Sequence, residues 1–191
     1  MKRPLLFAVL AALSLIGSAV MAAPLLQSDF EGFGDGTLLT DQVPGADFTN
    51  GVVLEAGLSL NELEFPPHSG VAVLTDDGGP IEIMFDDLAS SFEAYFTFVL
   101  PVTLTAFDIL DGIVDVATSL FTDNYVSSGN APNELLSVAG SGISRVVIEG
   151  DPFGGSFVMD DMTAQFPSAP VPAPATPLLL LLGLVALRIK G

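Results

Sequence analysis

The stretch that most constrains the fold is Phe92–Phe98, in which two kinds of residue alternate. On one side of an extended chain lie the apolar residues Phe92, Ala94, Phe96 and Phe98, and on the other lie Glu93, Tyr95 and Thr97. Successive side chains of a β-strand point to opposite faces. The pattern therefore predicts a half-buried strand with an aromatic inner face.

Similar short segments, separated by turn residues, run from Gln27 to Phe166. The alternating segments 71–73 and 81–85 flank Asp76–Pro80 and predict a hairpin, with Asp86-Asp87 ending its second strand. No stretch between them has the pattern of an amphipathic helix. We therefore expect an all-β protein, an antiparallel β-sandwich of jelly-roll type with about eight to ten strands. An immunoglobulin-like sandwich is the alternative.

The N-terminus has the pattern of a secretory signal peptide covering residues 1–22. Lys2 and Arg3 precede an apolar run, and a patch of small residues ends at Ala23. We place cleavage after Ala22, because cleavage one residue later would leave Pro24 just beyond the bond. A permanent N-terminal anchor is the alternative. Residues 23–168 then form one β-sandwich domain.

The C-terminus is organised as a proline-rich spacer, 169–177, followed by an apolar segment with a basic end, 178–191. Even counted from Ala173, the apolar segment spans only about 22 Å as a helix, against about 30 Å of bilayer hydrocarbon. Arg188 and Lys190 should stay on the cytoplasmic side, which places the preceding domain outside. A buried core helix is the alternative interpretation.

This C-terminus resembles a PEP-CTERM sorting tail. The resemblance is carried by Val171, Pro172 and Pro174, by the apolar run and by Arg188, with Ala173 where the family usually has glutamate. It implies recognition by an exosortase, contact with the inner membrane before processing, and export to the cell surface or extracellular matrix of a Gram-negative bacterium that makes extracellular polysaccharide.

Charge limits the classes of molecule that the protein can bind, and cysteine content limits the ways in which its fold can be stabilised. Between residues 23 and 168 Arg145 is the only basic residue, and all 23 acidic residues lie there, so this region carries a formal charge of −22. Such a surface repels nucleic acid and anionic lipid, and favours cations, neutral sugars or basic surfaces. Solubility or a saline habitat would also explain the acidity. Without cysteine, stability must come from a core or a bound metal.

Few residues could support catalysis. His68 is the only histidine, and residues 23–168 contain neither cysteine nor lysine, so the sequence shows no nucleophile with its base. His68 is more simply interpreted as a solvated loop residue. Paired carboxylates could serve a small secreted glycan-cleaving enzyme, which is the alternative to a protein without catalytic activity.

The first and last strands resemble those of jelly-roll carbohydrate-binding modules. The resemblance rests on Asp29-Phe30-Glu31 near the start and on Phe157–Met162 near the end. It implies that the two ends lie side by side and that Glu31 and Asp160, with Asp161, hold a structural calcium ion. Ordinary acidic residues at strand ends are the alternative. Together these features predict a non-catalytic, calcium-stabilised envelope or matrix protein that binds exopolysaccharide.

Overall fold

The structure is a computed structural model that describes residues 23–168 of the 191-residue chain. The described residues form ten strands and one short 3-10 helix, η1. Their bounds are β1 Leu25–Ser28, β2 Leu38–Leu39, β3 Ala46–Thr49, β4 Gly51–Glu55, β5 Ala72–Asp76, β6 Ile81–Phe98, β7 Thr103–Phe107, β8 Ile113–Thr118, η1 Val126–Ser128, β9 Glu134–Glu149 and β10 Phe157–Gln165. The predicted signal peptide, spacer and apolar segment lie outside the described residues. Within 23–168, no helix has the length and apolar character needed to cross a membrane.

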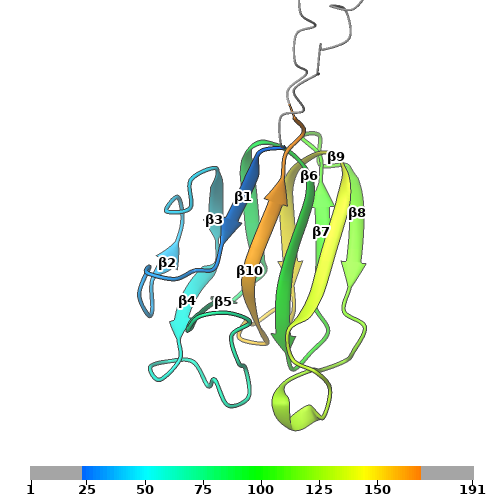
Figure 1. The fold of residues 1–191 in the computed structure, drawn as a ribbon. Coiled ribbons are helices and arrows are strands. Elements are labelled where there is room, and N and C mark those ends of the chain that lie inside the picture. Colours follow the sequence, from blue (N-terminus) through cyan, green and yellow to red (C-terminus); the bar gives the residue numbers. More distant parts are fainter. Residues whose placement is uncertain (1–22, 169–191) are drawn as a thin grey trace, which may run out of the picture. The chain divides into compact units, whose positions relative to one another are not determined.

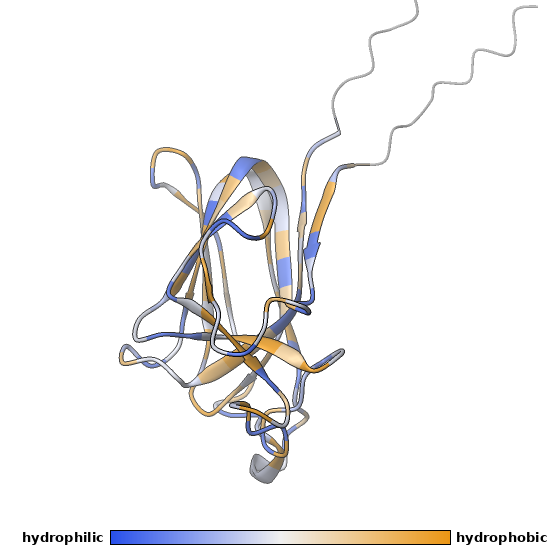
Figure 2. Cartoon of the chain, turned by 90° about the vertical axis from the view of Figure 1, so that its left-hand side faces the viewer, coloured by the Kyte–Doolittle hydropathy of each residue, from blue (hydrophilic) through white to orange (hydrophobic). Residues whose placement is uncertain are grey.

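The strands form an antiparallel β-sandwich, as predicted (Figures 1 and 2). Hydrogen bonding runs in the order β2-β4-β5-β10-β6-β9-β7-β8, with β1 beside β10 and β3 beside β6. The two long strands, β6 and β9, belong to both layers. Residues 91–98 of β6 pair with β10 in the front layer, whereas residues 82–85 pair with β3 in the back layer.

A bend in β6 joins the two layers. The register with β9 shifts between Met84 and Ala89 and again between Ala89 and Ser91, and Asp86–Leu88 are exposed. Irregularities of this kind bend a strand while the ladder continues on either side. The prediction that Asp86-Asp87 ends a strand is therefore wrong, because pairing with β9 resumes beyond the bend.

The predicted hairpin is also wrong. β5 pairs with β4 and β10 in the front layer, and the turn after Asp76 carries the chain to the back layer, where β6 begins. Gly78 and Gly79 have φ values of 79° and 155°, which allow this crossing. All five residues of β5 are buried, as expected for a strand with neighbours on both sides and cover on both faces.

The core lies between the layers and is rich in phenylalanine. Alternating hydrophobic and hydrophilic residues along the strands are visible in Figure 2. The aromatic rings that are fully buried in the core are those of Phe30, Phe92, Phe96, Phe98 and Phe157. The predicted inner face of 92–98 is confirmed, with one exception: Thr97 is buried and bonded to Asn133, whose backbone N–H donates to its hydroxyl at 3.0 Å.

The two ends of the domain lie side by side, as the second resemblance implied. β1 pairs antiparallel with the last part of β10, from Leu25 opposite Gln165 to Ser28 opposite Met162. The N–H of Phe166 continues this ladder by donating to the carbonyl of Pro24 at 3.0 Å. The front layer therefore contains both ends of the described chain.

Candidate functional site on the front layer

A hollow of about 450 Å³ lies on the outer face of the front layer. We call it the front hollow, and its lining comes from β1, β6, β10 and the residue after β1: Gln27, Ser28, Asp29, Glu93, Tyr95, Asp161, Met162 and Thr163. Outward positions of these strands supply most of the lining, because their inward neighbours are used in the core. The exception is Met162, a fully buried core residue. Hydroxyl, amide and carboxylate groups dominate it.

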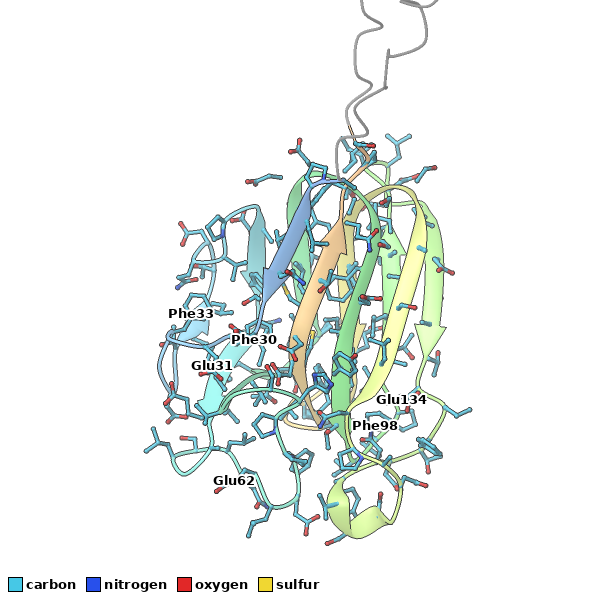
Figure 3. All side chains as sticks on the ribbon, viewed as in Figure 1. Phe30, Glu31, Phe33, Glu62, Phe98 and Glu134 are labelled. Carbon is cyan, nitrogen blue, oxygen red and sulfur yellow. The ribbon has the colours of Figure 1, made fainter. Side chains whose placement is uncertain are left out.

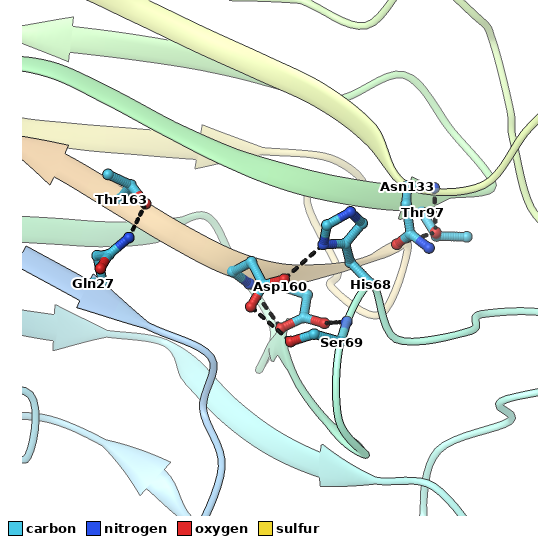
Figure 4. A network of polar contacts seen from close by, with 8 residues as sticks. Gln27, His68, Ser69, Thr97, Asn133, Asp160 and Thr163 are labelled. Carbon is cyan, nitrogen blue, oxygen red and sulfur yellow. Dashed lines mark hydrogen bonds and ion pairs between the residues drawn. The ribbon is translucent and has the colours of Figure 1, made fainter.

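A row of polar side chains crosses four strands at this place. Gln27 of β1 lies opposite Thr163 of β10, Thr163 lies opposite Glu93 of β6, and Glu93 lies opposite Ser137 of β9. The Gln27 amide donates to the Thr163 hydroxyl at 3.5 Å (Figure 4). Neighbouring strands are about 4.8 Å apart. The row therefore offers hydrogen-bonding groups at regular intervals across the sheet.

An aromatic pair stands beside this row. Tyr95 is two residues after Glu93 on the same face of β6, and the imidazole of His68 stacks on its ring, with centroids 3.5 Å apart and planes 7° from parallel. His68 Nδ1 also lies 2.6 Å from Asp161 Oδ2 (Figure 4). His68 is exposed, as predicted, but it is held by two side chains and is not simply solvated.

The same contacts argue against a catalytic triad. The Ser69 hydroxyl donates to Asp161 Oδ1 at 2.8 Å, so serine and histidine both bind the aspartate and not each other. A nucleophilic serine needs its hydroxyl against the imidazole base. The three residues therefore act as a clamp that fixes the loop before β5 onto β10.

Beneath the clamp lies Asp160, which is only 1% exposed. Its Oδ2 accepts the Ser69 N–H at 2.9 Å and its Oδ1 accepts the Asp161 N–H at 2.7 Å. Burial raises the pKa of this carboxyl to about 6, against the lowering effect of those hydrogen bonds. Asp160 lies opposite Tyr95 in the pairing of β10 with β6, so it is on the outer face and is buried by the loop that contains Ser69. Asp161 has φ 47° at a register shift in β10, and this irregularity lets both neighbouring carboxylates contact the same loop.

Glu31 ties the start of the domain to the same loop (Figure 3). Its Oε1 accepts the N–H groups of Val71 at 2.6 Å and Ala72 at 2.8 Å. Gly70 has φ 55°, and any Cβ there would collide with the Glu31 carboxylate. Only glycine fits between this carboxylate and the clamp.

The three predicted calcium ligands therefore converge on one segment, His68–Ala72. In the structure, Glu31 Oε1 and the four carboxylate oxygens of Asp160 and Asp161 bind protein donors or the His68 ring. Among residues 23–168, no group of three or more histidine or acidic side chains is placed to hold a metal ion. Calcium stays a prediction. The sorting residues Val171, Pro172, Pro174 and Arg188 lie outside the described residues.

A second buried carboxyl is that of Asp76, the last residue of β5. It is 4% exposed, its Oδ1 accepts the Gly155 N–H at 2.8 Å, and burial raises its pKa. A glycosidase acid must combine a raised pKa with access to its substrate. Asp76 and Asp160 are both too buried to reach a substrate, so this geometry does not favour the glycan-cleaving alternative.

Comparison with known proteins identifies no family, since no family model and no curated protein matches the chain. Solved structures show distant similarity. A family 22 xylan-binding domain from Paenibacillus barcinonensis matches 79% of this chain and 100% of its own, at 13% identity and a TM-score of 0.42. A mutant family 29 carbohydrate-binding module matches 78% and 100%, at 11% identity and 0.41. A family 11 module from Clostridium thermocellum matches 76% and 98%, at 10% identity and 0.35.

Proposed function

We propose that this chain is an exported, non-catalytic protein that binds a neutral polysaccharide in the front hollow. The observation that carries the proposal is the polar row beside an aromatic pair. Gln27, Thr163 and Glu93 supply donors and acceptors across three strands. A linear chain of sugars presents hydroxyl groups repeatedly along its length, so it can use several of these groups at once.

The aromatic pair supplies the second kind of contact. Sugar rings have apolar C–H faces, which pack against aromatic rings that are held rigidly. His68 is exposed on the stack, and Asp161 holds it in place. The rigid pair loses little conformational entropy when a ligand binds.

Charge determines which polysaccharides fit. Residues 23–168 carry a formal charge of −22, and Glu93, Asp29 and Asp161 line the hollow itself. A uronic-acid or sulfated polymer would be repelled, whereas a neutral one would not. We therefore expect neutral glucans, mannans or xylans to be preferred.

Delivery follows from the two ends of the sequence. We propose export through the signal peptide 1–22 and exosortase recognition of the tail through Val171, Pro172, Pro174 and Arg188, with the cell surface or extracellular matrix as destination. Intact mass of the exported protein tests this. The expected species lacks residues 1–22 and those beyond about Pro172, and a species that keeps the tail would contradict exosortase processing.

Binding is tested by affinity electrophoresis in gels that contain neutral mannan, xylan or mixed-linkage glucan, with alginate as the acidic comparison. Tyr95→Ala should weaken retardation about tenfold, since it removes the support of the aromatic pair. Thr105→Ala, on the outer face of β7, is the control and should change nothing. No retardation by any neutral polymer, or equal loss in both variants, would overturn the proposal. Release of reducing sugar would support the enzyme instead.

A further inference from the structure

A second surface feature shares no lining residue with the front hollow. Five large apolar side chains are exposed around the bend of β6 and the turn between β7 and β8: Met84 49%, Leu88 46%, Ile109 77%, Leu110 86% and Ile113 66%. We call them the apolar tip. Met84, Leu88 and Ile109 line a shared hollow of about 440 Å³. Clustered apolar exposure of this kind marks interaction surfaces.

The exposure of the tip is fixed by the structure of the turn. Asp108 Oδ1 accepts the N–H groups of Leu110 and Gly112, each at 2.8 Å. Asp111 has φ 61°, which completes the tight reversal between β7 and β8. Ile109 and Leu110 are thereby held outward at the apex, although burial would be favourable for both.

The tip lies at the end of the sandwich where the described chain ends. The rings of Phe85 and Phe166 make an edge contact with centroids 6.0 Å apart. The Ser90 hydroxyl, just beyond the bend, donates to the carbonyl of Gln165 at 3.1 Å. Residues 167–177, which reach about 40 Å at most, then connect this end to the predicted membrane segment 178–191.

We propose that the apolar tip inserts into the interface of a zwitterionic lipid bilayer. The link to the predicted membrane segment starts at this end, so its length keeps this end within about 40 Å of the bilayer whenever that segment is inserted. Insertion removes the exposed apolar area from water. It also leaves the outer face of the front layer open for polysaccharide, because the tip is built from the bend and the β7–β8 turn.

The charges around the tip determine the kind of lipid. Asp86, Asp87 and Asp108 border the same hollow. Arg145, the only arginine among residues 23–168, is paired with Asp111 at 3.0 Å and Glu82 at 3.1 Å. The rim is therefore acidic, and anionic headgroups would be repelled. A phosphatidylcholine surface matches this rim better than a phosphatidylglycerol surface.

Depth-dependent quenching tests the proposal in the chain that keeps its predicted membrane segment. The protein has no cysteine, so one introduced cysteine carries a fluorophore at a single place. Leu110→Cys labels the tip, and Leu120→Cys labels a matched residue, 81% exposed, just beyond the other end of β8. In phosphatidylcholine vesicles containing doxyl lipid, quenching at 110 should exceed that at 120 at least threefold. Equal quenching, no quenching at 110, or no association with vesicles would overturn the proposal.

A second set of variants tests the apolar side chains of the tip with the fluorophore attached at a different residue. With the fluorophore at Leu88→Cys, the pair Ile109→Ser and Leu110→Ser should at least halve quenching, whereas Leu120→Ser should not change it. Replacing half of the lipid with phosphatidylglycerol at low salt should also reduce quenching. If the tip instead binds a second copy, the chain will sediment as a dimer that the serine pair dissociates, with no quenching at 88, and the proposal fails. Polysaccharide retardation is measured separately, so either proposal can fail alone.

Discussion

The front hollow and the hollow at the apolar tip have almost the same volume, about 450 and 440 Å³, but opposite linings. The first is lined by outward residues of paired strands and is mainly polar. The second is formed by a bend and a turn, and its lining includes Met84, Leu88 and Ile109. In one sandwich, regular strands thus present hydrogen-bonding groups, while irregular segments present apolar side chains with an acidic rim.

The two hollows also depend on the rest of the molecule to different degrees. The front hollow is directly above the phenylalanine core and beside the clamp of His68, Ser69 and Asp161, so changes in either should reach it. The tip is held locally, by Asp108 and the β7–β8 reversal. Substitutions that separate these dependencies test the comparison.

The largest effect should come from Phe96→Ala. Phe96 directly follows Tyr95 in β6, and its ring is fully buried. The centroids of the Phe96 and Phe157 rings are 6.0 Å apart. The cavity should lower the free energy of unfolding by about 3–5 kcal/mol and weaken polysaccharide binding. Phe153→Ala is the control, because Phe153 is 89% exposed and should cost less than about 0.5 kcal/mol. Denaturant unfolding measures both, and similar losses would contradict the dependence on the core.

This core was largely predictable from sequence, because alternation in a strand reports directly which face is buried. Phe92, Phe96 and Phe98 point inward as expected. The bend of β6 was not predictable, since Asp86-Asp87 in an apolar strand indicates a strand end unless pairing with β9 is known. Strand pairing is a long-range property, and the local sequence of β5 or β6 does not indicate which strands it pairs with.

The candidate site was predictable only in part. Glu31 and Asp160 were expected to meet because the first and last strands resembled a known pair, and both contact the segment His68–Ala72. The role of His68 was missed because its partner, Asp161, is 93 residues away in sequence. Two adjacent acids inside a strand are nevertheless a usable signal: one must face the core unless the strand is irregular.

The next effect concerns pH and the buried carboxyl under the clamp. Burial raises the pKa of Asp160 from an ordinary value near 3.8 to about 6, so the folded protein holds this proton more tightly than the unfolded chain does. Stability must then fall as pH rises from about 4 to about 6, by about 2 kcal/mol for this group.

Unfolding measured between pH 4 and pH 7 checks this prediction. Wild type should lose about 2 kcal/mol more over that interval than Asp160→Asn, whose amide does not titrate. Asp76 has a pKa raised by burial as well, but it is common to both proteins and cancels in the difference. If the stability of wild type and that of Asp160→Asn depend on pH in the same way, the Asp160 carboxyl ionises in the folded protein without a desolvation penalty.

A smaller effect is expected from Glu31. Glu31→Ala removes the acceptor of the Val71 and Ala72 N–H groups and should lower the free energy of unfolding by about 1–3 kcal/mol. Glu31→Gln keeps a carbonyl oxygen and should lower it by less, which denaturant unfolding measures.

Substitutions at Glu31 and Asp160 also test the calcium prediction at fixed ionic strength. Calcium at a hundredfold excess over its Kd should stabilise wild type by about 2.7 kcal/mol, and magnesium much less. Equal shifts with both ions, or an unchanged calcium shift in Glu31→Gln and Asp160→Asn, would contradict a calcium site.

The smallest effect on stability should come from the tip itself, which is what makes it informative. Ile109→Ser with Leu110→Ser removes two side chains that are 77% and 86% exposed, so almost no apolar burial is lost. The backbone N–H of residue 110 still reaches Asp108. We therefore expect a change below about 0.5 kcal/mol in the free energy of unfolding and unchanged retardation by neutral polysaccharide. A loss of several kcal/mol would mean that the tip packs against the domain and does not face lipid. Loss of polysaccharide binding would mean that the two hollows form one surface, and the division between a polar face and an apolar end would no longer hold.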